Sequence, residues 1–76
     1  MNTIINIIET HRTFCAPYWY GKDNKEGVTF NLVIPEERVI NDLKNAISGN
    51  RDFSLYDEGS DRYTLLVFGE SAKYWQ

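Results

Sequence analysis

The 76-residue sequence contains one cysteine, Cys15, and one histidine, His11. A single cysteine excludes a framework of intramolecular disulfides. A structural zinc site is also disfavoured, because such sites generally use four Cys or His ligands. A chain of this length buries only about 60% of the surface that its unfolded form exposes. We therefore expect dense aromatic packing, or association with another chain, to supplement a small core.

Long hydrophobic runs and an excess of positive charge are absent as well. No apolar run approaches the roughly 20 residues that a transmembrane helix requires, and no targeting signal is recognisable. With one unpaired cysteine, this favours the cytoplasm. The net charge of −3 gives no general attraction to nucleic acids or anionic membranes, which bind clustered Lys and Arg. We expect one cytoplasmic domain, residues 1–76, without a membrane partner.

Motifs of the common enzyme classes are missing. There is no Gly-x-Gly-x-x-Gly run, Walker loop, Gly-x-Ser-x-Gly elbow or His-Glu-x-x-His. His11 and Cys15 are the only candidates for a nucleophilic pair, but on an extended strand their Cα atoms lie about 13 Å apart, too far for direct proton transfer. We interpret them as a surface imidazole and a small buried thiol. The sequence thus predicts a protein that is not an enzyme, with no catalytic residue, metal or cofactor.

Three acidic residues, Asp57, Glu58 and Asp61, occupy a predicted hairpin turn. Their spacing does not match a calcium-binding loop, which needs oxygen ligands at alternate positions and a distant glutamate. The loop at residues 22–27 does not match a calcium-binding loop either, for the same reason. We interpret the three acids as solvated turn residues that form an acidic rim and orient a partner.

Residues 35–48 predict a helix. Pro35 suits the first helical position, Glu36 and Glu37 complement the helix dipole, and Gly49 stands where a left-handed terminator belongs. Apolar residues fall on one face at helical spacing, namely Val39, Ile40, Leu43, Ala46 and Ile47.

Alternation of apolar and polar residues predicts strands on both sides of this helix. Residues 27–34 form one, and residues 51–57 and 61–69 form a hairpin whose second strand is apolar on both faces and therefore interior. Residues 13–20 are extended, because Pro17 disfavours helical geometry in the residue before it. We expect this segment to pair with residues 27–34.

The start of the chain is ambiguous. Residues 3–11 are rich in β-branched isoleucine, which favours a strand. Ile4, Ile5 and Ile8 also make a helical stripe, with Thr3 available as an N-cap. We prefer the strand. The fold class is then α+β: a single-layer antiparallel sheet of four to five strands with one helix, about 35–48, on one face. The order is β-β-β-α-β-β, or α-β-β-α-β-β if the first segment is helical.

Two aromatic clusters stand out against this fold. Tyr18, Trp19 and Tyr20 are consecutive, so in a strand Trp19 faces opposite to both tyrosines. Tyr74 and Trp75 form a second cluster in the tail. Both tryptophans could instead close the ends of the core. A single helix covers one side of the sheet and leaves Tyr56, Thr64, Leu66 and Phe68 on the other, which is typical of an association surface.

We therefore predict a non-catalytic protein-binding module that inhibits a larger protein by occluding its surface through an aromatic patch. A viral accessory or anti-defence protein, an antitoxin and an immunity protein are all of this kind. The alternatives are a homodimeric structural or regulatory protein and a single-stranded nucleic-acid binder. The second is permitted by a modest basic end, in which Arg12, Lys22 and Lys25 flank the aromatics. The expected partner-binding residues are Tyr18, Trp19, Tyr20, Tyr56, Phe68, Tyr74 and Trp75, with Asp57, Glu58 and Asp61 as the rim.

Overall fold

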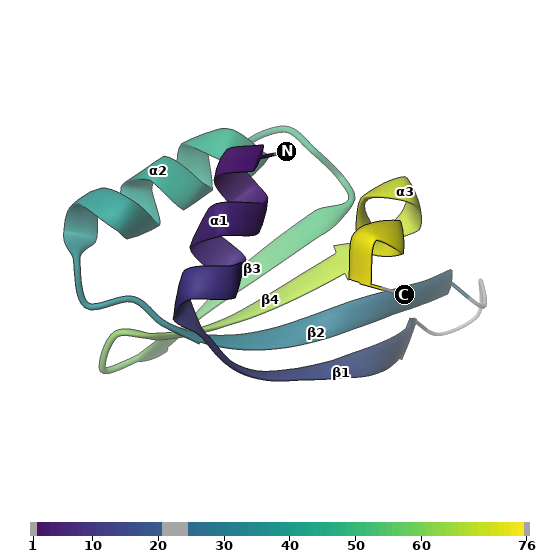
Figure 1. Cartoon of the computed structure of the whole chain (residues 1–76), viewed down its shortest axis with the longest axis horizontal. Coiled ribbons are helices and arrows are strands. Elements are labelled where there is room, and N and C mark those ends of the chain that lie inside the picture. Colours follow the sequence, from purple (N-terminus) through teal and green to yellow (C-terminus); the bar gives the residue numbers. More distant parts are fainter. Residues whose placement is uncertain (1, 21–24, 76) are drawn as a thin grey trace.

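A computed structural model describes residues 2–20 and 25–75, except for the side chains of Asn2, Tyr20 and Lys25. Four antiparallel strands form one open sheet in the order β1-β2-β4-β3, and α1 and α2 lie on the same side of it (Figure 1). The predicted α+β class with one antiparallel sheet is confirmed. The elements are α1 (Asn2–His11), β1 (Arg12–Tyr20), β2 (Lys25–Val33), α2 (Glu37–Ile47), β3 (Phe53–Gly59), β4 (Arg62–Phe68), α3 (Gly69–Ala72) and a 3-10 turn, η2 (Lys73–Trp75).

The preferred strand over residues 3–11 is wrong, because these residues form helix α1. Ile4 and Ile8 lie one turn apart and are both buried in the core, with Ile7 packed beside them. The burial of this stripe outweighs the weak preference of isoleucine for strands. The order is therefore α-β-β-α-β-β, the alternative prediction, and the expectation of a single helix is also wrong.

Helix α2 is the predicted central helix, shortened at its start. Pro35 lies before Glu36, the N-cap, rather than at the first helical position. Gly49 follows the helix at a φ of +75°, so its expected role as a left-handed terminator is confirmed. The helix buries Ile40, Leu43 and Ile47 against the sheet, but Ala46 is exposed, contrary to the sequence prediction.

The two predicted hairpins are present, and β4 is interior as expected, because it pairs with β2 on one side and β3 on the other. The core-facing side chains of β2 and β4 alternate as the sequence predicts. Buried core residues contributed by the sheet and the segment after β2 are Val28, Phe30, Leu32, Ile34, Phe53, Tyr63, Leu65 and Val67.

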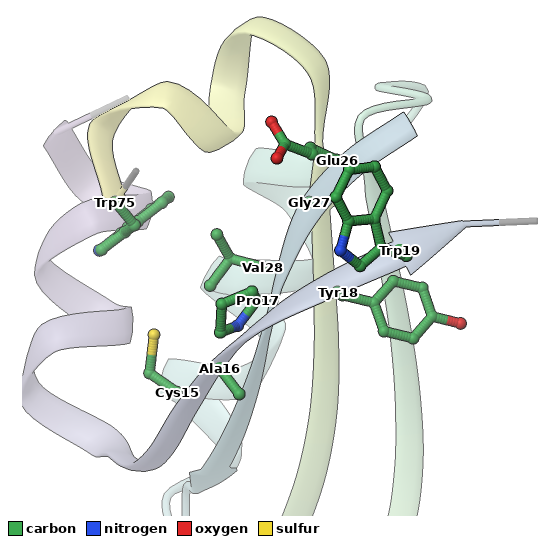
Figure 2. Close-up of a pocket in the computed structure, with 9 residues that line it drawn as sticks. All are labelled: Cys15, Ala16, Pro17, Tyr18, Trp19, Glu26, Gly27, Val28 and Trp75. Carbon is green, nitrogen blue, oxygen red and sulfur yellow. The ribbon is translucent and has the colours of Figure 1, made fainter. Parts of the chain in front are cut away.

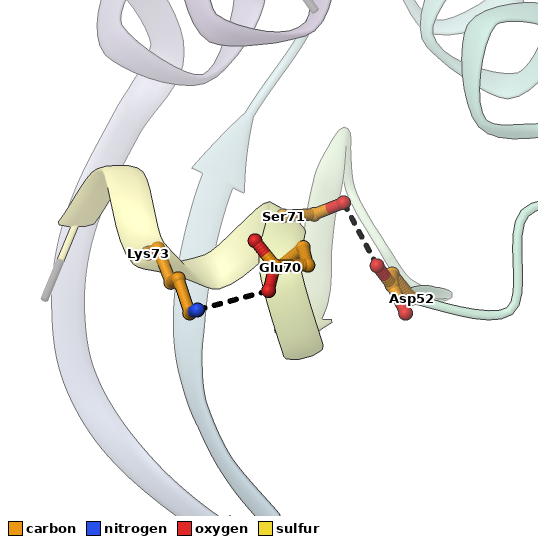
Figure 3. A network of polar contacts seen from close by, with 4 residues as sticks. All are labelled: Asp52, Glu70, Ser71 and Lys73. Carbon is orange, nitrogen blue, oxygen red and sulfur yellow. Dashed lines mark hydrogen bonds and ion pairs between the residues drawn. The ribbon is translucent and has the colours of Figure 1, made fainter.

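Segment α3–η2 closes one end of the core, and the sequence did not predict it. Gly69 turns the chain at a φ of +64°. The Ser71 hydroxyl then donates a hydrogen bond to Asp52 Oδ2 at 3.0 Å, while Lys73 pairs with Glu70 at 2.9 Å (Figure 3). The hydrogen bond from Ser71 fastens the tail to the loop that precedes β3, whereas the Lys73–Glu70 pair lies within the tail.

Trp75 completes this closure. Its ring packs edge-to-face on Phe30 with centroids 4.9 Å apart, and its indole N–H donates to Glu9 Oε1 at 3.1 Å. The last turn thus joins α1 to the sheet. Among the described residues, no helix is long and apolar enough to cross a membrane.

Candidate protein-binding surfaces

The alternation of side chains along β1 divides the first aromatic cluster between the two sides of the sheet. Tyr18 lies opposite Gly27 of β2, and Trp19 lies opposite Glu26. Figure 2 shows the rings of Tyr18 and Trp19 on opposite sides of the strand. The predicted alternation is confirmed, so the two rings belong to different surfaces.

The first surface is the side of the sheet that carries no helix, which we call the open face. Directly opposed residues of an antiparallel pair share a face, so the register defines rows across the sheet. One row runs from Phe14 through Asn31 and Thr64 to Tyr56. The side chains at its two ends, Phe14 and Tyr56, are 53% and 52% exposed. The other members of the open face are Ala16, Tyr18, Gly27, Thr29, Ser54, Leu66 and Phe68.

A glycine shapes one end of the open face. Gly27 lies between Tyr18 and Phe68, whose rings meet edge-to-face with centroids 5.8 Å apart. A Cβ atom on Gly27 would lie 2.5 Å from the Val67 carbonyl oxygen and 2.7 Å from Phe68 Cδ1. Glycine is therefore needed at position 27 for the Phe68 ring to pack directly against the backbone of the sheet.

Leu66 is the apolar centre of the open face and is only 8% exposed although no helix covers it. Its neighbours Tyr56 and Phe68 flank a depression of 350 Å³ that it helps to line. The open face is thus shallow and mixed in character. Leu66 and the aromatic rings supply its apolar surface, and polar side chains, including Ser54, Arg51 and Asp52, line the rest of the depression.

The second surface lies on the other side of β1 and is called here the helix-side groove. It is a cavity of 260 Å³ whose lining side chains include Cys15, Pro17, Trp19, Glu26, Val28 and Trp75 (Figure 2). Helices α1 and α3 make their main sheet contacts with the inner strands, chiefly β2, rather than with the edge strand β1. Trp19 is consequently 62% exposed, although it points to the same side of the sheet as the core.

The predicted partner-binding residues therefore do not form one patch. Tyr18, Tyr56 and Phe68 share the open face, whereas Trp19 and Trp75 line the groove. Tyr74 is 59% exposed and stacks edge-to-face on Trp75 at 5.0 Å. The side chain of Tyr20 and residues 21–24 lie outside the described part of the chain.

Sequence reasoning missed several residues of these surfaces, of which Phe14 and Glu26 matter most for function. Phe14 shares the open face with Tyr18, which alternation counted backwards along β1 would have indicated. Glu26 could not be found in this way, because its position opposite Trp19 depends on the strand register.

The acidic rim lies at the β3–β4 hairpin end beyond Tyr56, but only Asp61 is in the turn itself. Asp57 and Glu58 belong to β3, which extends further than the sequence predicted. Gly59 N–H donates to Asp57 Oδ1 at 2.8 Å, and the Thr64 hydroxyl donates to Glu58 Oε2 at 2.9 Å. The rim thus shapes its own turn. Burial raises the pKa of the nearby Tyr63 phenol, and the negative charges of Asp57, Asp61 and Glu37 raise it further.

His11 and Cys15 have different environments. His11 Nδ1 donates to the Val33 carbonyl at 3.2 Å. Cys15 is exposed, so its interpretation as a buried thiol is wrong, because α1 does not cover the edge strand that carries it. Within residues 2–20 and 25–75, no three His, Cys, Asp or Glu side chains are placed to share a metal ion.

Comparisons with known proteins assign no function, so a function can be inferred only from these surfaces. No family model, curated protein or solved structure matches the chain.

Proposed function

We propose that the protein is a non-catalytic binding module that acts by covering a surface of a larger protein with its open face. The observation that carries this proposal is the exposure of Phe14 and Tyr56, at 53% and 52%, on a side of the sheet that no helix covers. Large rings exposed on a rigid element are the side chains that dominate binding energy at protein interfaces.

The dimensions of the open face indicate what else the partner touches. Four strands about 4.8 Å apart and seven to nine residues long give a face of roughly 400–500 Å². An interface of standard size buries about 800 Å² on each partner. The partner therefore extends beyond the sheet, and the acidic rim at the β3–β4 turn is the charged surface next to Tyr56. A partner with positive charge at that position is favoured.

The mode of action that fits these features is occlusion. The domain offers a rigid surface with exposed aromatic rings and a charged margin, and needs no chemistry of its own to block a site on a larger molecule. Inhibitors of host or defence enzymes, antitoxins and immunity proteins act in this way, and we propose that the chain belongs to this kind of protein.

The test begins with affinity capture of the partner from the native cell, or from its host if the gene is viral, followed by titration of purified components. Phe14→Ala and Tyr56→Ala should each weaken binding by about 2 kcal/mol, which is roughly 30-fold. Circular dichroism should show both variants folded, because both rings are exposed. Asn41→Ala, on the exposed side of α2, is the control and should bind normally. Unchanged affinity of both aromatic variants would contradict the proposal.

Two further measurements separate the alternatives. A homodimer that pairs through the open face would show twice the monomer mass in light scattering, and Tyr56→Ala would return it to a monomer. A single-stranded nucleic-acid binder would lose affinity steeply with added salt.

A further inference from the structure

We infer that the helix-side groove binds one basic side chain, arginine or lysine, presented by a protein segment. This surface lies on the opposite side of β1 from the open face, so the inference goes beyond the proposed function and does not depend on it.

The argument starts from the cross-strand pair of Trp19 and Glu26. Directly opposed residues have Cβ atoms about 4.5–5.5 Å apart, and both of these side chains are exposed. Figure 2 shows the Glu26 side chain next to the Trp19 indole, with its carboxylate directed away from the ring. A cation at this point would meet the face of an aromatic ring and a carboxylate together, which are two favourable interactions for the same charge.

No ion pair that the structure gives among the described side chains occupies this position. The ion pairs formed among the described residues join Arg12 to Glu9 and Lys73 to Glu70, and neither includes Glu26. The Glu26 carboxylate thus faces the groove without an ionic partner in the part of the chain that the structure describes.

The rest of the groove can accommodate the methylene groups of an arginine or lysine side chain. Pro17 and Val28 supply apolar surface, and Trp75 stands on the far side. The Trp75 ring is held in place by its contact with Phe30 and its hydrogen bond to Glu9. Arginine and lysine side chains commonly bury their methylene groups along apolar surface and keep the charged end at the rim.

Size and charge together select this occupant over others. Sites for cofactors and drug-sized ligands generally enclose about 300–1,000 Å³, whereas this groove encloses 260 Å³. It lies just below the low end of that range, and a single side chain fits within it. A neutral apolar side chain would remove water from Glu26 without replacing its interactions, which disfavours binding.

The experiment uses the full chain and the tripeptide acetyl-Ala-Arg-Ala-amide, followed by ¹⁵N–¹H NMR. We expect saturable millimolar binding that shifts the Trp19 indole N–H and the amides of Glu26 and Val28. The citrulline tripeptide, which has the same shape but no charge, should bind about tenfold more weakly. The lysine tripeptide should bind, and the norleucine tripeptide should not.

Two variants locate the interaction. Glu26→Gln should weaken binding about threefold to fivefold, and Trp19→Leu should weaken it by a similar factor. Asp42→Asn removes the same charge from the exposed side of α2 and should change nothing. The amide spectrum of each variant reports whether it is folded.

Three outcomes would overturn the inference: equal binding of arginine and citrulline peptides, no saturable shifts, or shifts that map to the open face. Phe14→Ala should leave tripeptide binding intact, so failure of the proposed function and failure of this inference are distinguishable.

Discussion

Gly27→Ala tests the close approach that shapes the open face. The new Cβ would lie 2.5 Å from a backbone oxygen and 2.7 Å from a ring carbon, and the ring can move more easily than the backbone of β4. Inserting a methyl group into a tightly packed site generally costs about 1–3 kcal/mol. Replacing glycine also restricts the unfolded chain, which returns about 0.4–1 kcal/mol. The net expectation is a loss of about 1–2 kcal/mol in the free energy of unfolding.

Thermal and urea unfolding followed by circular dichroism measure this loss. The midpoint should fall by about 5–15 °C for a domain of this size, with an unchanged dependence on urea. In a Phe68→Ala background the same substitution should cost less, because one of the two close contacts is gone, although the Val67 carbonyl remains. A Gly27→Ala variant as stable as the parent protein would refute this reasoning.

Two further predictions concern the end of the core and the acidic rim. Trp75→Phe keeps a ring on Phe30 but removes the indole donor to Glu9, so urea unfolding should show a loss of about 0.5–1.5 kcal/mol, and Trp75→Ala should lose more. An equal loss in both variants would show that the ring contact is unimportant. Because the pKa of Tyr63 is raised in the folded state, the folded protein holds this proton more tightly, and stability should fall as the pH rises above about 10. Urea unfolding of Tyr63→Phe should show a weaker decline with pH, and an identical decline would contradict the assignment.

The sequence was sufficient where one pattern dominated. Residues 27–34 alternate without interruption, and Val28, Phe30 and Leu32 are buried as expected. Helix α2 was predicted because its apolar spacing and terminator agree. The first segment failed because isoleucines at positions 4, 5 and 8 satisfy both a strand and a helix. The choice between them depends on packing against the distant β2 and α2, which a local pattern does not contain.

The candidate surfaces could be predicted from the sequence only in part. Alternation separated Tyr18 from Trp19, and the open side of the sheet followed from the single predicted helix. Glu26 and Gly27 gain their importance from the residues opposite them, so their roles could not be recognised without the strand register. The helical tail was missed because Gly69 and Ser71 act through Asp52, 17 and 19 residues earlier in the chain.

The irregularity at the start of β1 has a consequence for both surfaces. The pairing with β2 shifts between Arg12 and Phe14, which leaves Thr13 as an extra residue. A bulge of this kind shifts the alternation of side chains between the two faces of the sheet for the rest of the strand. Deleting Thr13 would place Phe14 directly after Arg12 and restore uninterrupted pairing, so Tyr18 would stay opposite Gly27 and Trp19 would stay opposite Glu26. The extra residue thus adjusts the junction between α1 and β1, and the regular pairing beyond it assigns each aromatic ring to its surface.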